Sequence, residues 1–302
     1  MAHKSSEGNL LIGDDYTALF DCGMMFCAES TIENVKNALS GRPLDYIFMT
    51  HTHYDHIGAL PFFRNEWGGL RSVTCEAGAA VLLKSTPRRV IRDLSITAAI
   101  PHNIEFKKDY DENLFHADII VNDNDIISLG GLSVQVLATP GHTRDSLSFF
   151  VPELELLILN ETPGVLFSIP LQGLISKHSN EGTKNNEMIY PCYLTSFFDT
   201  MKSIEKCMQV KYKHISLPHR GVMCNNEADG IFEKALEANA ACRDFIVSMK
   251  GKNYSEDEML DSFFQKYAND TLLSYQPKEA FLANARATIA CTLKELSMSS
   301  ET

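Results

Sequence analysis

Residues 50–56 read Thr50-His51-Thr52-His53-Tyr54-Asp55-His56, so three histidines and an aspartate fall within one short stretch. An apolar run at 46–49 precedes it directly, which indicates a buried strand that ends in a polar loop. Neutral imidazole and carboxylate groups are ligands that zinc, iron and manganese accept. Because the chain has only ten histidines, this clustering favours a metal site over a polar turn that happens to be rich in histidine.

The spacing within the stretch suggests two metals. His51 and His53 are two residues apart, so their side chains project to the same side of an extended backbone. Asp55 and His56 follow where the chain has to turn. Four such side chains exceed what one metal can easily take from a short segment. We therefore expect the second pair to serve a second metal beside the first.

The same stretch resembles the signature of the metallo-β-lactamase superfamily, which reads His-x-His-x-Asp-His after a strand. The resemblance implies an α/β fold, a four-layer αββα sandwich with a one- or two-metal site at the edges of its sheets. Asp21-Cys22-Gly23 is similar to the family's early Asp-x-Gly, whose aspartate supports the metal-site loop rather than binding metal.

Three later strand ends extend the resemblance. Pro140-Gly141-His142-Thr143 is similar to the family segment that supplies the third histidine of the first metal. Asn160-Glu161-Thr162 stands where most members have Gly-Asp-Thr, whose aspartate bridges the two metals. Pro218-His219-Arg220-Gly221 resembles the segment that carries the last histidine, a ligand of the second metal. His214, at the beginning of the same strand, matches no ligand position, and we expect it to be structural or exposed.

The resemblance therefore implies two divalent metal ions and seven ligands: His51, His53 and His142 for the first metal, Asp55, His56 and His219 for the second, and Glu161 as the bridge. Glu161 keeps the carboxylate of the family's aspartate but holds it one methylene further out. It could still bridge, or it could bind one metal only. Zinc is the first candidate, and iron and manganese remain open because the same ligands accept all three.

Two domains are expected, an αββα domain over 1–224 and a C-terminal helical extension over 225–302. Within the first, 86–125 is a possible lid or pocket wall containing Ile96, Ile100, Ile104 and Phe106, or else a surface excursion packed on the sandwich. The long, irregular connection over 164–193 follows Glu161 directly and should border the substrate. The helical tail resembles those of glyoxalase II and of the quinolone-signal response thioesterase.

Capping boxes mark two expected helix starts. In a capping box, a serine or threonine is followed three residues later by glutamate or glutamine. Ser30-Thr31-Ile32-Glu33 predicts a helix that ends near Leu39, and Ser255-Glu256-Asp257-Glu258 predicts one that continues to about Tyr267. We also expect helices over 58–67, 195–208, 231–249 and 277–296.

The composition of the chain limits the classes of partner and the cellular compartment that we expect. The formal net charge of −12 weighs against a broad nucleic-acid surface, which would require clustered Lys and Arg. No apolar run approaches the roughly 18 residues that cross a bilayer, and residues 1–8 lack the apolar core of a signal peptide. The eight cysteines are scattered without a Cys-x-x-Cys pair, which fits reduced thiols in the cytoplasm. We expect a cytoplasmic protein with a small-molecule acyl substrate, no nucleic-acid or membrane partner, and a possible homodimer.

The resemblance implies a metal-dependent hydrolase. Two cations about 3.5–4 Å apart lower the pKa of a shared water, and the resulting hydroxide attacks the carbonyl of a thioester, ester or lactone. Asp55 can orient this nucleophile and pass a proton onward. Two alternatives stay open, an iron-dependent oxidoreductase of the same fold and a non-catalytic metal-binding regulatory protein.

Overall fold

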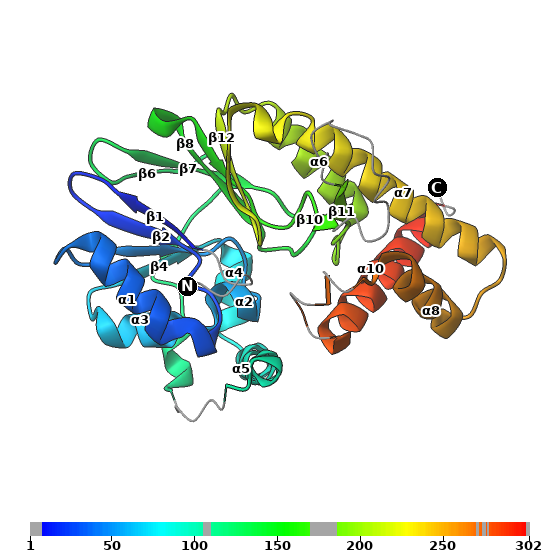
Figure 1. The fold of residues 1–302 in the computed structure, drawn as a ribbon, viewed down its shortest axis with the longest axis horizontal. Coiled ribbons are helices and arrows are strands. Elements are labelled where there is room, and N and C mark those ends of the chain that lie inside the picture. Colours follow the sequence, from blue (N-terminus) through cyan, green and yellow to red (C-terminus); the bar gives the residue numbers. More distant parts are fainter. Residues whose placement is uncertain are drawn as a thin grey trace, which may run out of the picture.

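Two β-sheets lie face to face at the centre of the molecule, and helices cover both outer faces (Figure 1). The structure is a computed structural model that describes residues 8–104, 110–169, 186–269, 272–273, 276 and 278–299. Its layers run helix, sheet, sheet, helix. The predicted four-layer αββα sandwich is therefore confirmed.

The first sheet is five-stranded and contains, in spatial order, β1 (Asn9–Ile12), β2 (Thr17–Phe20), β3 (Tyr46–Phe48), β4 (Arg71–Thr74) and β5 (Ile119–Ile120). β1 and β2 form an antiparallel hairpin, whereas β2 through β5 pair in parallel. The carboxyl ends of parallel strands meet at one edge of a sheet. The loop that follows β3 is therefore delivered to that edge.

The second sheet is six-stranded, in the order β13 (Gly221–Cys224), β12 (His214–Leu217), β9 (Leu156–Ile158), β8 (Leu147–Val151), β7 (Ser133–Ala138) and β6 (Ile126–Ser128). β9 and β12 are parallel, so the loops after them leave at one edge. β8 is antiparallel to both β7 and β9, which gives β7 and β9 the same direction. The loops after β7, β9 and β12 thus emerge together.

Aromatic side chains fill the space between the sheets. The Phe48 ring centroid lies 5.0 Å from that of Phe20 and 5.4 Å from that of Phe149 on the opposite sheet. Leu19 and Ile47, one residue before Phe20 and Phe48, are also buried, but they face the outer helices α1 (Ala28–Leu39) and α3 (Leu60–Glu66). Burial on both faces explains why β2 and β3 are apolar without alternation.

Helices α6 (Phe197–Met208) and α7 (Ile231–Gly251) cover the outer face of the second sheet, where Ile204 and Phe232 pack against Ile215. The second half of α7 continues beyond the sheet and packs, through Cys242 and Ile246, with α8 (Glu256–Tyr267) and α10 (Lys278–Ser299) (Figure 1). One helix therefore joins the sandwich to the C-terminal helices.

Helix boundaries test the capping boxes. α8 has the predicted box, since Ser255 Oγ accepts from the Glu258 backbone N–H and the Glu258 side chain accepts from the Ser255 N–H. The prediction at Ser30 was wrong, because a 3₁₀ turn (Met25–Cys27) runs directly into α1 and the helix begins at Ala28. The Ser30 hydroxyl instead donates back to the Cys27 carbonyl, at 3.0 Å.

The connections also differ from expectation. The helix expected over 58–67 is α3, but a short helix that was not expected, α2 (Tyr54–Ile57), precedes it. The 164–193 connection contains a hairpin of β10 (Val165–Ile169) and β11 (Asn186–Tyr190). Residues 170–185, and Phe106 of the expected lid, lie outside the described residues. The rest of the expected lid contains α5 (Ser85–Ala99), which follows α4 (Glu76–Leu82). Among the described residues, no helix has the length and apolar character needed to cross a membrane.

Candidate metal centre

The structure brings all seven predicted ligands together at the edge where the two sheets meet. Their ligand atoms form two groups, and within each group the atoms lie within 4.8 Å of one another: His51, His53, His142 and Glu161 in the first, and Asp55, His56, Glu161 and His219 in the second. Glu161 belongs to both. The first sheet contributes the four residues after β3, and the second sheet contributes the other three.

Local backbone structure aims these side chains. Asp55 and His56 lie in α2, the short helix that forms directly after His53. The sequence predicted a turn at this position, and the helix achieves the turn while keeping both side chains at the centre. His219 occupies the tight connection between β12 and β13 with a φ of 61°, a left-handed conformation that a non-glycine residue seldom adopts. Such strain is typical of functional sites.

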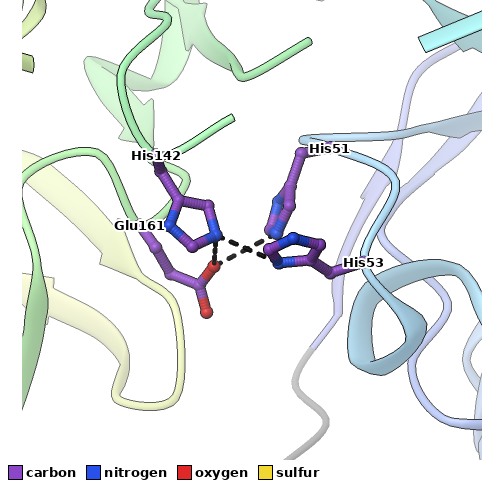
Figure 2. A group of neighbouring side chains, drawn as sticks. All are labelled: His51, His53, His142 and Glu161. Atoms are coloured by element: carbon purple, nitrogen blue, oxygen red, sulfur yellow. Dashed lines mark hydrogen bonds and ion pairs between the residues drawn. The ribbon is translucent and has the colours of Figure 1, made fainter. Parts of the chain in front are cut away.

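In the first group, three imidazoles and one carboxylate oxygen converge on a single point (Figure 2). Glu161 Oε2 lies 2.8 Å from His142 Nε2 and 3.1 Å from His51 Nε2. His53 Nδ1 lies 3.1 Å from His142 Nε2. His51, His142 and Glu161 are buried, whereas His53 is half-buried and leaves one side of the group open.

The second group uses the other oxygen of the same carboxylate. Glu161 Oε1 lies 2.6 Å from His219 Nε2 and 3.3 Å from His56 Nε2. Asp55 Oδ2 lies 3.7 Å from each of these two imidazole nitrogens. The two oxygens of Glu161 are therefore divided between the groups, one to each.

Two imidazoles are held by acceptors behind them. His142 Nδ1 donates to the backbone carbonyl of Cys192 at 2.6 Å, which fixes the proton on that nitrogen. His56 Nδ1 lies 2.8 Å from Asp21 Oδ2, and the Asp21 carboxylate also accepts the Thr50 backbone N–H at 2.8 Å. The expected supporting role of Asp21 is thus visible as direct contacts. A proton on Nδ1 leaves the Nε2 lone pair facing the centre, as in metal-ligating histidines.

This donor set fits a cation. Lone pairs of Nε2 atoms and carboxylate oxygens face one another, an arrangement that repels unless a positive charge lies between them. His51 Nε2 and Glu161 Oε2 are buried, and their close contacts with each other and with His142 Nε2 do not have the geometry of a hydrogen bond. Buried polar atoms are rarely left unsatisfied. Imidazole and carboxylate together suit divalent metals of the zinc, iron and manganese type.

In the metal-free chain the site holds its charge as protons on histidine. Burial disfavours the imidazolium of His56, but the carboxylates of Glu161 and Asp21 outweigh it and raise its pKa well above the usual value. Burial also opposes protonation of His219, but its hydrogen bond to Glu161 and the charges of Glu161 and Asp55 together raise its pKa. Burial lowers the pKa of His53 to about 4. The histidines of the metal-free site therefore bind protons over different pH ranges.

An apolar cavity of about 170 Å³ opens onto the candidate metal ligands. Val165, Phe167 and Tyr190 of the β10–β11 hairpin form one wall, and Ala280 and Ala283 of α10 form another. The expectation that the 164–193 connection borders this space is met by the part that the structure describes. The cavity lies between the sandwich and the C-terminal helices, so both parts of the chain shape it.

Helix α5 contributes a third wall, but not with the residues that we expected. Leu94 lines the cavity, whereas Ile96 and Ile100 are 38% and 67% exposed. Ile91, Leu94 and Ala98 are spaced three and four residues apart and share the inner face of the helix. The carbonyl of Cys192 was also missed, because every residue has a carbonyl and no sequence signal marks one that holds a histidine.

The sequence profile of the metallo-beta-lactamase superfamily matches residues 9–162. A metallo-beta-lactamase fold-containing protein of Sulfurisphaera tokodaii, ST1585, is 28% identical over 188 residues, 60% of this chain and 62% of that protein. A hydroxyacylglutathione hydrolase of Rhodopseudomonas palustris is 31% identical over 129 residues, 43% of this chain and 36% of that enzyme. The aligned regions therefore span less than two thirds of either relative.

A solved structure extends the likeness over nearly the whole chain. The metallo-beta-lactamase family protein TTHA1429 of Thermus thermophilus superposes with a TM-score of 0.60 at 17% identity, covering 96% of this chain and 88% of that one. Identity this low shows a common fold, including the C-terminal helices, and leaves the chemistry to be argued from the site itself.

Proposed function

Since the chain belongs to the metallo-beta-lactamase superfamily, we propose that it is a metal-dependent hydrolase of thioesters, esters or lactones. The observation that carries the proposal is the double group of ligands that shares Glu161. A hydroxyacylglutathione hydrolase among the relatives supports a thioester as the first substrate class to test.

The proposal assigns His51, His53 and His142 to one metal, Asp55, His56 and His219 to the other, and Glu161 to both. When bound, two divalent ions would supply a water of lowered pKa and would polarise a carbonyl oxygen. Zinc is the first candidate for both positions, with iron and manganese as alternatives.

Residues of the chain would accept the proton, orient the imidazoles and exclude water. Asp55 is half-buried at the floor of the cavity, where its carboxylate can accept a proton from the attacking water and orient it. Asp21 and the Cys192 carbonyl keep two imidazoles in one orientation. The apolar walls formed by Val165, Phe167 and Leu94 exclude water from around an acyl group.

The test combines metal analysis with turnover. The purified protein is expected to contain up to two divalent ions per chain and to hydrolyse members of a panel of acyl thioesters, aryl esters and lactones. Dialysis against a chelator should abolish hydrolysis, and added zinc, manganese or iron should restore it. The metal that restores it best then identifies the working ion.

A matched pair of variants sharpens the test. His142→Ala should lose metal and turnover together, because this imidazole lies in the first group. His214→Ala removes a histidine five residues before His219 that belongs to neither group, and it should retain both metal and turnover. Hydrolysis that persists after complete metal loss, or metal binding without hydrolysis of any compound in the panel, would overturn the proposed function.

A further inference from the structure

A second cavity meets the first at the metal-binding residues. It is an open groove of about 340 Å³, and we refer to it as the α5 groove. His53, Tyr54 and Leu94 line both spaces, so the two cavities lie on either side of these residues. A substrate whose reacting carbonyl lies beside His53 could therefore extend one part into each cavity.

The α5 groove is apolar along its length. Helix α5 supplies Pro87, Val90, Ile91 and Leu94, and Val81 of α4 extends the same wall. Val90 is 49% exposed, so its side chain is accessible to a ligand that enters the groove. The opposite wall is the loop after His142, where Thr143 and Arg144 lie.

Arg144 is the one basic side chain among the residues that line this groove. It is exposed, and it has no ion pair or hydrogen bond with any residue that the structure describes. Its positive charge is therefore not neutralised by a carboxylate among the described residues and is available to an anionic ligand in the groove. The neighbouring Asp145 is buried and already accepts the Thr52 backbone N–H at 2.9 Å.

The first cavity has the opposite electrostatic character. The residues that line it include the carboxylates of Asp55, Glu161 and Glu279, and none is lysine or arginine. An anionic group deep in that space, beyond the metal positions, would face Glu279 without a counter-charge. Charge therefore orients a two-part substrate, with its neutral acyl chain in the first cavity and any anionic part in the α5 groove.

We propose that the α5 groove binds the leaving group of the substrate, and that this leaving group is an anionic thiol or alcohol whose negative charge pairs with Arg144. The inference rests on the proposed hydrolase function and names its substrate class, a neutral acyl group esterified to an acidic carrier. In hydrolysis, the oxygen of one water bonds to the acyl carbon, the carbon–sulfur or carbon–oxygen bond breaks, and the departing atom takes up a proton.

The test uses two thioesters that differ only in charge, hexanoyl esters of mercaptohexanoate and of its uncharged amide. Wild-type protein should have a lower KM for the anionic thioester, and added salt should reduce the difference. Arg144→Ala should raise KM for the anionic compound about fivefold with kcat little changed, as expected for one exposed charge pair. KM for the amide should stay within about twofold.

Two further variants locate the effect. Arg89→Ala is the control. Arg89 is also exposed, its guanidinium contacts the Thr86 hydroxyl, and it is not among the residues that line the groove, so its removal should leave both KM values unchanged. Val90→Trp fills the groove with a bulky side chain at an exposed position. It should raise KM for both long-chain thioesters but not for the methyl thioester of the same acyl group.

A binding measurement separates this inference from the proposed function. The thioether analogue of the anionic compound cannot be hydrolysed, so its Kd for metal-loaded protein needs no turnover. Weaker binding to Arg144→Ala than to Arg89→Ala would support the groove even if neither thioester were cleaved. Equal Kd values for the two variants, or equal KM changes for the charged and uncharged thioesters, would overturn it.

Discussion

Glu161 Oε1 lies 2.6 Å from Nε2 of His219, while the second oxygen of the same carboxylate points away into the other group of histidines. A longer side chain at this position therefore reaches both groups with separate atoms. An aspartate has one methylene less and would have to reach them from a shorter arm. In this geometry the glutamate can therefore offer one oxygen to each group.

Replacing Glu161 by glutamine tests this division. The amide keeps one oxygen but exchanges the other for an NH₂ group, which cannot bind a cation. Glu161→Gln should bind one metal ion per chain where the wild type binds two, as measured by equilibrium dialysis with elemental analysis. Glu153→Gln is the control, because the Glu153 carboxylate accepts the Ser133 backbone N–H and belongs to neither group. Two tightly bound ions in Glu161→Gln would contradict the division.

Removing the charge of Asp21 should lower the affinity of the second group for metal. In Asp21→Asn an amide replaces the carboxylate that faces His56 Nδ1 at 2.8 Å. Loss of such supporting contacts typically costs about 10–100-fold in metal affinity. A competition titration with a chromophoric chelator measures the change. Asp45→Asn is matched to it, since Asp45 likewise accepts a backbone N–H, that of Thr17, but lies away from the site. Equal affinities in the two variants would refute the role.

Metal-free and metal-loaded protein should respond to pH in opposite directions. The pKa values of His56, His142 and His219 are raised in the metal-free chain, although burial opposes each shift. A raised histidine pKa contributes stability that is complete below the unfolded value of about 6.5 and is lost as pH rises through the folded value. The Tm of chelator-treated protein should therefore fall as pH rises above about 6.5.

Metal binding reverses that trend because metal ions compete with protons for imidazole. The affinity for zinc should rise over the same pH interval, and the Tm gained on adding zinc should grow with it. Differential scanning fluorimetry with and without zinc at each pH measures both. A zinc-induced Tm gain that is flat across this interval would show that the histidines do not change protonation there.

The C-terminal helices should depend on one aromatic side chain. Phe281 of α10 is fully buried, and its ring centroid lies 5.6 Å from that of Tyr190, which lines the first cavity. Phe281→Ala should cost about 3–5 kcal/mol in the free energy of unfolding, measured by urea titration. Leu83→Ala, at a side chain that is 76% exposed, should change it by no more than about 0.5 kcal/mol. Similar losses in both variants would refute this packing.

The candidate ligands could be predicted because each lies in a short polar segment directly after an apolar strand. His51 and His142 illustrate the rule, and the structure places both in the first group. The residues of the substrate cavity were harder to predict. Leu94 and Ile96 are both apolar and both in α5, and only the packing of the helix decides that the first faces inward and the second is exposed.

Two further features could not be predicted from the sequence: a backbone carbonyl that contacts a histidine, and the residue at which a helix begins. The carbonyl of Cys192 holds His142, yet a carbonyl carries no signal in the sequence. Helix α1 begins at Ala28, two residues before the predicted cap Ser30, because the 3₁₀ turn over Met25–Cys27 continues directly into it. Such a turn is stabilised by contacts with the rest of the fold, which a local pattern does not contain.

The division of the ligands between the two sheets has a consequence for how the protein assembles. His51, His53, Asp55 and His56 come from the first sheet, and His142, Glu161 and His219 come from the second. Neither sheet alone supplies all the ligands of a group, so tight metal binding would require that the two sheets have packed together. The bound ions would then act as a cross-link across the seam of the sandwich, and metal uptake would report the last step of folding.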